Sequence, residues 1–306
     1  EISKMTGRDY HLFNYYGAED AEDIIIVMGS GADTVRTVVE KLNAEGKKVG
    51  VLVVHLYRPF SVKHFMGAIP ASVKRIAVLY RTKEPVAFGE PLYLDVRAAF
   101  YASDRNPMII GGRYGLGSKD LVPADVVAVF DNLAAAEPKN NFTVSIVDDV
   151  TNTSLPVTAN IDVTKEGTKA CKFWGLGSDG TVGANKSTVE IINAHTSKFA
   201  QAYFEYDAKK SFGVTKSHLR FGDAPIKSSY YVTKANFVAC HNPSYLVKGY
   251  KIVNDVKPGG IFLINCQWTA EELNHHLDAA SKRYIAENNV QLYTINAIDL
   301  AKEIGM

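Results

Sequence analysis

The sequence predicts an α/β protein of two consecutive domains, each with a largely parallel, helix-covered sheet. Its 306 residues exceed one average domain and suffice for two with sizeable cores. Short apolar runs alternate with capped, helix-like stretches in both halves, which is typical of parallel sheets. Between the halves, around residues 141–167, the helix pattern stops and polar residues dominate.

The first predicted domain, residues 1–140, begins with a β-branched run. Asp23–Met28 has the composition of a buried parallel strand, and the turn after it leads into a helix that ends near Glu45. Strands and helices then continue to alternate, which favours a parallel sheet covered on both faces. The remaining expected elements are strands at 48–55, 73–79 and 107–111 and helices at 91–102 and 123–135.

Residues 141–167 are predicted to be a linker or an edge segment, and residues 168–306 the second domain. Within the connector, Phe142–Val147 is apolar enough to add a strand to a sheet edge. Thr269 followed by Glu272 forms a capping box, which marks a helix start. The second domain is expected to contain strands at 199–206, 214–221, 235–240, 260–265 and 291–294 and helices at 187–194, 269–288 and 297–304.

Composition excludes several classes of function. Hydrophobic residues make up 46% and charged residues 22% of the chain, as in ordinary globular proteins. A net charge of +1, without a stripe of Lys and Arg, disfavours nucleic-acid binding. We find no apolar run of membrane-spanning length and no signal-peptide layout, so the sequence favours a cytoplasmic protein without a membrane partner.

The sequence offers few groups for catalysis or metal binding. Cys171, Cys240 and Cys266 are far apart and lie in or beside apolar runs, so we interpret them as buried, unpaired thiols. His241 follows a predicted strand, and His218 lies on another, but neither has a nearby nucleophile or a metal-ligand spacing. We therefore predict no catalytic residue and no metal ligand in this chain.

The most informative segment is Gly175–Lys186, which we call the glycine loop. Four of nine consecutive residues from Gly175 are glycines, and polar residues suited to capping a helix stand between them. A helix start carries unpaired N–H donors and a partial positive charge, so a phosphate is favoured there. The residues expected to hold such a ligand are Gly177, Ser178, Asp179, Gly180, Thr181, Gly183, Asn185 and Lys186.

Two nucleotide-binding motifs come close to the glycine loop. The spacing of Gly175, Gly177 and Gly180 matches the dinucleotide fingerprint, but Asp179 would place a carboxylate beside the pyrophosphate. A P-loop requires Lys directly after its last Gly, whereas two residues separate Gly183 from Lys186. A tight strand-to-helix turn without any ligand is the remaining interpretation.

A longer pattern shows a family resemblance. Thr168–Lys186 resembles the signature of the 2-oxoacid:ferredoxin oxidoreductases, most closely the single-chain pyruvate:ferredoxin (flavodoxin) oxidoreductases. The similarity extends over nearly the whole chain, so it is more specific than either motif alone. Further similar stretches are 10–18, 27–30, 55–60, 111–115, 217–222 and 237–245.

The resemblance implies two middle domains of a longer enzyme: a transketolase C-terminal-like domain, then a domain of the oxidoreductase gamma type associated with coenzyme A. In that family pyruvate is oxidatively decarboxylated with coenzyme A to acetyl-CoA, and ferredoxin or flavodoxin is reduced. Thiamine diphosphate, magnesium and [4Fe-4S] clusters carry the chemistry. This chain has neither the clustered cysteines nor a thiamine diphosphate motif, so those groups are expected on other domains.

The partners implied by the resemblance are the remaining domains, ferredoxin or flavodoxin, and a second copy in a homodimer. Gly175–Lys186 is then expected to bind coenzyme A. Because its charge repels a phosphate, Asp179 is expected either to turn back and cap the following helix or to hydrogen-bond the adenosine or pantetheine part of the ligand. The alternative is a stand-alone module that binds a nucleotide or coenzyme A without catalysis, of which an NAD-linked dehydrogenase is a less favoured version.

Overall fold

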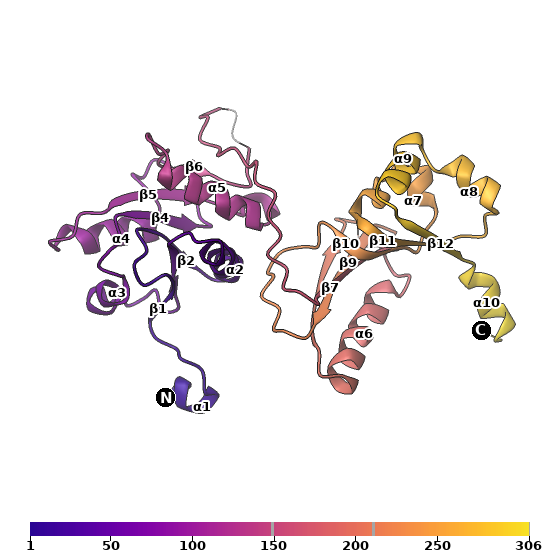
Figure 1. Cartoon of the computed structure of the whole chain (residues 1–306), viewed down its shortest axis with the longest axis horizontal. Coiled ribbons are helices and arrows are strands. Elements are labelled where there is room, and N and C mark those ends of the chain that lie inside the picture. The colour runs from indigo at the N-terminus through magenta and orange to yellow at the C-terminus, as the bar shows by residue number, and fades with distance from the viewer. Residues whose placement is uncertain (148–149, 210–211, 306) are drawn as a thin grey trace. The chain divides into compact units, whose positions relative to one another are not determined.

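The computed structural model describes residues 1–147, 150–209 and 212–305, and it divides into two compact units (Figure 1). Unit 1 comprises Glu1–Val163 together with Lys227–Tyr230, and unit 2 comprises Thr164–Ile226 and Tyr231–Met306. Each unit contains a mixed sheet with helices packed on it. The predicted α/β class with largely parallel strands is confirmed.

In the described part of unit 1 the sheet has six strands in the order β1-β3-β2-β4-β5-β6. The sequence pattern did not predict β1, which pairs antiparallel with β3, whereas the other neighbours are parallel. An antiparallel edge strand on a parallel sheet is common in α/β folds. The strands are β1 (Phe13–Gly17), β2 (Asp23–Met28), β3 (Val49–Val54), β4 (Arg75–Tyr80), β5 (Met108–Arg113) and β6 (Phe142–Thr143).

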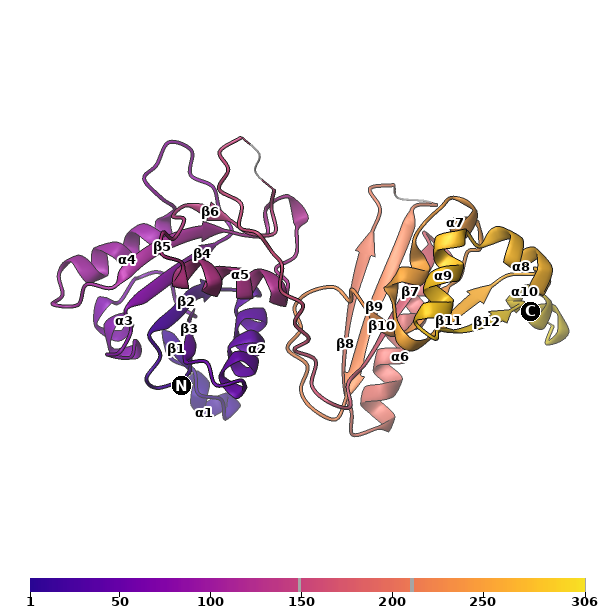
Figure 2. The same ribbon diagram turned by 45° about the horizontal axis from the view of Figure 1, so that its top comes forward.

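Helices cover both faces of the unit 1 sheet. One face packs against α2 (Gly31–Ala44) and α5 (Pro123–Ala134), and alternate residues of β2, β3 and β4 form its apolar core. The other face packs against α3 (Val62–Ala68) and α4 (Pro91–Tyr101) with a separate core. Figure 2 shows these four helices around the strands, with the short α1 (Ile2–Thr6) near the N-terminus. A 3-10 turn, η1 (Leu116–Ser118), follows β5.

Part of the polar connector packs on unit 1. Phe142 in β6 is fully buried, and Val144 and Leu155 belong to the same core as α2 and α5. The chain crosses from unit 1 to unit 2 between Val163 and Thr164. The segment after residue 141 is polar in composition, but its few apolar side chains pack on the first sheet.

In the described part of unit 2 the sheet has six strands in the order β12-β11-β10-β7-β9-β8. The strands from β12 to β7 run parallel, and β9 and β8 are antiparallel to their neighbours. The strands are β7 (Lys169–Leu176), β8 (Phe199–Tyr206), β9 (Val214–Gly222), β10 (Ala235–Cys240), β11 (Val256–Asn265) and β12 (Gln291–Ile295).

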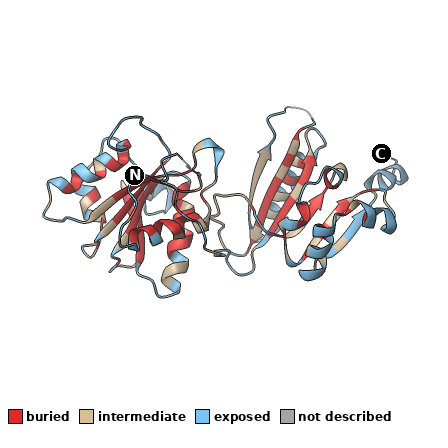
Figure 3. Cartoon of the chain, turned by 90° about the horizontal axis from the view of Figure 1, so that it is seen from above, coloured by how far each residue is buried: buried red, intermediate tan, exposed pale blue. Residues whose placement is uncertain are grey.

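Helices of unit 2 lie unevenly on this sheet. The apolar core forms on one face, under α7 (Ser244–Val247), η2 (Ile252–Asp255), α8 (Ala270–His276) and α9 (Ala279–Glu287). On the other face α6 (Thr181–His195) contacts β7, β8 and β9. Figure 3 colours both units by burial and shows pale, exposed segments around β12 and the terminal α10 (Ala297–Glu303).

Two helix predictions were wrong in their limits. The helix expected at 269–288 is two helices, because Asp278 accepts a hydrogen bond from Ser281 N and starts α9 anew. The helix expected at 187–194 begins six residues earlier, at Thr181. Gly183 made that first turn look like loop, although a helix tolerates a single glycine at a modest cost.

Candidate anion-binding site

The carboxyl ends of β7 and β10 lie where the connections of the unit 2 sheet diverge. From β7 the chain passes through α6 to β8 on one side, and from β10 it passes through α7 to β11 on the other. Ligands of open α/β sheets bind at such a point. The glycine loop follows β7 there, and His241 follows β10 and donates its backbone N–H to the Trp174 carbonyl at 2.8 Å.

Glycines allow the glycine loop to turn sharply into α6. Gly180 has φ 86°, the left-handed region that side chains disfavour, and α6 begins at the next residue. A Cβ atom at Gly175 would lie 2.5 Å from Thr181 Oγ1, so only glycine permits this approach of strand and helix. The local sequence thus fixes where the first amides of α6 lie.

The carboxylate of Asp179 turns back on its own loop. Its Oδ2 accepts a hydrogen bond from Leu176 N at 2.7 Å, and its Oδ1 accepts one from Thr181 N at 2.8 Å. The expectation that this side chain turns towards the helix start is therefore confirmed. Because both oxygens are engaged by backbone amides, the carboxylate stabilises the turn.

Four amides of the turn have no acceptor among the residues that the structure describes. They are the N–H groups of Ser178, Gly180, Val182 and Gly183, and they come from the loop and the first turn of α6. Unpaired amides at a helix start form a ready site for an anion. Asp179 leaves these donors available because it uses only the amides of Leu176 and Thr181.

A pocket of about 140 Å³ lies between the glycine loop and the β8–β9 hairpin. Gly177 N donates to Gly213 O at 2.7 Å, which ties the loop to the hairpin. The volume corresponds to roughly five water molecules at their liquid density, enough for a phosphate group. The lining residues are Leu176, Gly177, Ser178, Asp179, Gly180, Val182, Tyr206, Asp207, Lys209, Gly213, Val214 and Thr215.

The lysine at this pocket differs from the one expected. Lys209, in the hairpin turn, lines the pocket. Lys186 is exposed on α6, where its Nζ lies 5.7 Å from the centre of the Phe204 ring on β8. The signal for Lys209 was present in the sequence, since two lysines follow the first of two adjacent predicted strands, and a hairpin returns such residues to the loop end.

Thr181, Asn185 and His241 form a hydrogen-bonded support beneath the loop. Thr181 Oγ1 lies 2.7 Å from His241 Nδ1, and Asn185 Nδ2 donates to the Thr181 carbonyl at 2.8 Å. Thr181 and Asn185 are buried. Burial lowers the pKa of His241, which the nearby Asp179 carboxylate partly opposes, so this imidazole is neutral at pH 7. His241 thus positions the first residue of α6.

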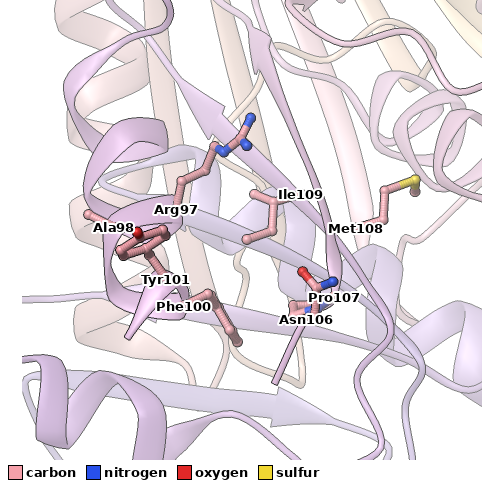
Figure 4. A pocket seen from close by; sticks show the side chains of 8 residues that line it. All are labelled: Arg97, Ala98, Phe100, Tyr101, Asn106, Pro107, Met108 and Ile109. Atoms are coloured by element: carbon pink, nitrogen blue, oxygen red, sulfur yellow. The ribbon is translucent and has the colours of Figure 1, made fainter. Parts of the chain in front are cut away.

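Two larger cavities lie in unit 1. Figure 4 shows the residues that line one of them, between α4 and β5; its volume is about 530 Å³, and Phe100, Tyr101, Met108 and Ile109 belong to its lining. The Arg97 guanidinium at its rim already donates to Tyr93 OH at 3.0 Å. A second cavity, of about 1200 Å³, lies between the N-terminal residues 1–3 and the segments 10–13, 55–56 and 63–68.

The remaining sequence predictions concern metals, thiols and membranes. Cys171, Cys240 and Cys266 are buried and unpaired, as expected. Within the described residues no group of three His, Cys, Asp or Glu side chains could hold a metal ion. None of the helices in the described ranges combines the length and the apolar character that crossing a bilayer requires.

Comparison with known families assigns both units. Residues 170–306 match the family model of pyruvate ferredoxin/flavodoxin oxidoreductase. Residues 21–126 match the model of pyruvate:ferredoxin oxidoreductase core domain II. The unit with the glycine loop and the unit before it are therefore matched separately by models that concern one kind of enzyme.

Individual relatives agree over the whole chain. It is 58% identical over 307 residues to the pyruvate-flavodoxin oxidoreductase of Enterobacter agglomerans, and 54% identical over 306 residues to the pyruvate:ferredoxin oxidoreductase of Moorella thermoacetica. The alignments cover 100% of this chain and 26% of each relative. The chain thus spans about a quarter of the length of these proteins.

Among solved structures, pyruvate oxidoreductase subunit PORC from Thermotoga maritima is similar with a TM-score of 0.35 and 19% sequence identity. The match covers 45% of this chain and 67% of that one.

Proposed function

Because the chain belongs to the pyruvate:ferredoxin (flavodoxin) oxidoreductase family, we propose that it is the coenzyme A-binding and scaffold part of an enzyme that oxidatively decarboxylates pyruvate. The whole enzyme converts pyruvate and coenzyme A to acetyl-CoA and carbon dioxide and reduces ferredoxin or flavodoxin. It acts in the cytoplasm as a homodimer. The relatives, which are about four times as long as this chain, are named pyruvate-flavodoxin oxidoreductase and pyruvate:ferredoxin oxidoreductase, and these names support the proposed reaction.

The cysteines of this chain do not suit an iron–sulfur cluster, and its sequence lacks a thiamine diphosphate motif. Cys171, Cys240 and Cys266 are buried and unpaired, and burial raises the pKa of the Cys171 and Cys240 thiols to about 11 and about 12. Such thiols resist conversion to the thiolates that ligate iron. We therefore place the redox groups on other domains and assign this chain a role in binding.

The observation that carries the proposal is the set of unpaired amides at the start of α6. Ser178, Gly180 and Gly183 offer N–H groups, and Ser178 adds a hydroxyl at the pocket. A phosphate of coenzyme A accepts several hydrogen bonds at once, and hydrogen bonds to a charged acceptor are roughly twice as strong as neutral ones. We assign this phosphate to the pocket of the glycine loop and the rest of the ligand to the surface beside it.

The other residues of the proposed site have supporting roles. Asp179 and Asn185 hold the loop and the first turn of α6 through backbone groups. Thr181 bonds with His241 beneath them. Gly177 permits the contact with the hairpin, where Lys209 supplies a cation. Lys186 remains a proposed contact for a more distant part of the ligand, since it does not line the pocket.

Calorimetric titration with coenzyme A tests the proposal. We expect Lys209→Ala to weaken binding by the worth of one charge-assisted hydrogen bond, about 1–3 kcal/mol. Lys186→Ala is the matched control, because it removes the same charge one element away and should change the affinity less. Equal binding by the wild type and by both variants would place the ligand elsewhere.

A ligand panel separates this proposal from the alternative of a stand-alone nucleotide-binding module. A ligand that binds only the folded state raises the melting temperature. We expect coenzyme A to stabilise unit 2, dephospho-coenzyme A to stabilise it less if the 3′-phosphate occupies the pocket, and thiamine diphosphate to have no effect. Stabilisation by NAD without any effect of coenzyme A would favour the alternative.

A further inference from the structure

One face of the unit 2 sheet carries apolar side chains and is only partly covered. In register across β10, β11 and β12, Ala239 lies beside Leu263 and Leu263 beside Tyr293. The neighbouring rows on the same face place Phe237 beside Ile261, and Asn265 beside Ile295. We call the surface formed by Phe173, Phe237, Ile261, Leu263, Tyr293 and Ile295 the open face.

Burial alternates along the strands in a way that identifies the open face. In β11, Phe262 and Ile264 are buried in the apolar core, whereas Ile261 and Leu263 between them are only half-buried. On β12, Tyr293 is 52% exposed and Ile295 is 37% exposed. Since successive side chains of a strand point to opposite faces, one face is packed and the other is incomplete.

In the described part of unit 2 the helices leave this face incompletely covered. Four of its helical segments contribute to the core on the opposite side. α6 is on the same side as the open face but contacts β7, β8 and β9, so it lies over the other half of the sheet. Within the described residues, Ile298 and Leu300 of α10 are themselves exposed, at 54% and 47%.

Parallel strands are found almost always with both faces covered, because each crossover places a helix on the sheet. β10, β11 and β12 form a parallel unit with the covering layer on one side only. On β10, β11 and β12 the open face spans three strands at about 4.8 Å spacing, a width that one helix of about 10 Å diameter covers, and Phe173 of β7 lies at its margin.

We propose that an amphipathic helix, supplied by the part of the longer enzyme outside these 306 residues, packs its apolar side on the open face. The relatives are about four times as long as this chain, so three quarters of their residues are available as the source. The six residues of the open face include no charged side chain, which favours an apolar partner over a nucleotide or an acidic peptide. This inference is independent of the assignment of coenzyme A to the glycine loop.

Hydroxyl-radical footprinting of Tyr293 tests the inference without any substitution. The label is compared between the 306-residue chain and the longer enzyme that carries it, with light scattering to establish the oligomeric state. We expect Tyr293 to be labelled in the monomeric 306-residue chain and to lose the label in the longer enzyme. Retention of the label in the longer enzyme would overturn the proposal.

A pair of matched variants provides the second readout. Ile295→Glu places a charge on the open face, and Thr294→Glu places the same charge on the opposite side of the same strand. In the 306-residue chain we expect both variants to melt with the wild type. In the longer enzyme only Ile295→Glu should lower the melting temperature. If the 306-residue chain instead dimerises and Ile295→Glu abolishes the dimer, a second copy is the occupant and the proposal fails.

Discussion

The two sheets of this chain are covered to different extents. In unit 1, alternate residues of β2, β3 and β4 feed two separate apolar cores, one under each layer of helices. In unit 2 the described residues form one apolar core, on one face of the sheet. The difference shows that the same α/β pattern can produce a sheet with an apolar core on both faces and a sheet with an apolar core on one face.

The largest expected effect concerns the loss of core side chains. Ile26 is fully buried in unit 1, whereas Leu263 is half-buried on the open face of unit 2. Ile26→Ala should lower the free energy of unfolding of unit 1 by about 2–5 kcal/mol, because it leaves a cavity. Leu263→Ala should lower that of unit 2 by roughly 1 kcal/mol, since less apolar area is lost.

The two tryptophans make this comparison measurable. Trp174 and Trp268 both belong to unit 2, so tryptophan fluorescence reports the unfolding of that unit, whereas far-UV circular dichroism reports both. We expect Ile26→Ala to shift only the dichroism transition. If Leu263→Ala destabilises unit 2 as much as Ile26→Ala destabilises unit 1, the two sheets are equally covered and the comparison fails.

The sequence predicted the apolar strands well and the polar contacts poorly. Asp23–Met28, Phe199–Tyr206 and Ala235–Cys240 were correctly bounded, because β-branched and aromatic runs between polar residues follow from burial alone. The break at Asp278 and the helix start at Thr181 were missed, since each depends on one capping or turning residue. Local propensity cannot anticipate such contacts where they override the pattern.

In the candidate site, too, contacts within one short segment were easier to predict than contacts between distant segments. The turn-back of Asp179 was predicted within a short segment because its charge repels a phosphate, and the structure shows that backbone amides of the same segment receive the carboxylate. The approach of Lys209 to the pocket depends on the pairing of β8 with β9, which are consecutive in the sequence. The approach of His241 depends on the pairing of β10 with β7, which are distant in the sequence, so it requires a strand order that the periodicity does not contain.

A change of pH should affect the two units differently. Burial lowers the pKa of His218 and His241 in unit 2 below the usual 6.5, despite opposition from nearby carboxylates. The unfolded state then binds protons more readily than the folded state, so the stability present above pH 6.5 is lost as the pH falls below that value. The pKa of Glu205 is about 2, which keeps its contribution intact in this range.

In unit 1, two groups affect the stability in opposite directions over the same pH range. Burial also lowers the pKa of His55, but it raises the pKa of Asp125 to about 6. A carboxyl group with a raised folded pKa gains stability as the pH falls from about 6 towards its unfolded value. We therefore expect acidification from pH 7 to pH 5.5 to lower the melting temperature of unit 2, measured by tryptophan fluorescence, more than that of unit 1, measured by circular dichroism.

A substitution of His218 tests whether this histidine causes the pH dependence of the stability of unit 2. In His218→Asn the amide oxygen can replace Nδ1 as acceptor for Val232 N, which lies 3.1 Å away in the wild type. The variant should keep most of the stability at pH 7 and show a shallower loss on acidification. An unchanged slope would assign the pH dependence of unit 2 to other groups.

The smallest expected effect concerns two residues with positive φ, one in each unit. Val86 lies in an exposed loop of unit 1 with φ 60°, and Ser178 lies in the glycine loop with φ 75°. A side chain in this region costs about 1–2 kcal/mol, whereas glycine adopts it freely but loses more entropy on folding. Val86→Gly should therefore stabilise unit 1 by at most about 1 kcal/mol.

Ser178→Gly should stabilise unit 2 less, because serine is not β-branched, and it should weaken coenzyme A binding by removing the hydroxyl at the pocket. Thermal melts of both variants with and without coenzyme A measure the two effects separately. If Ser178→Gly gains stability and binds coenzyme A as well as the wild type, the hydroxyl is not a ligand contact and the strained turn serves only to place the amides.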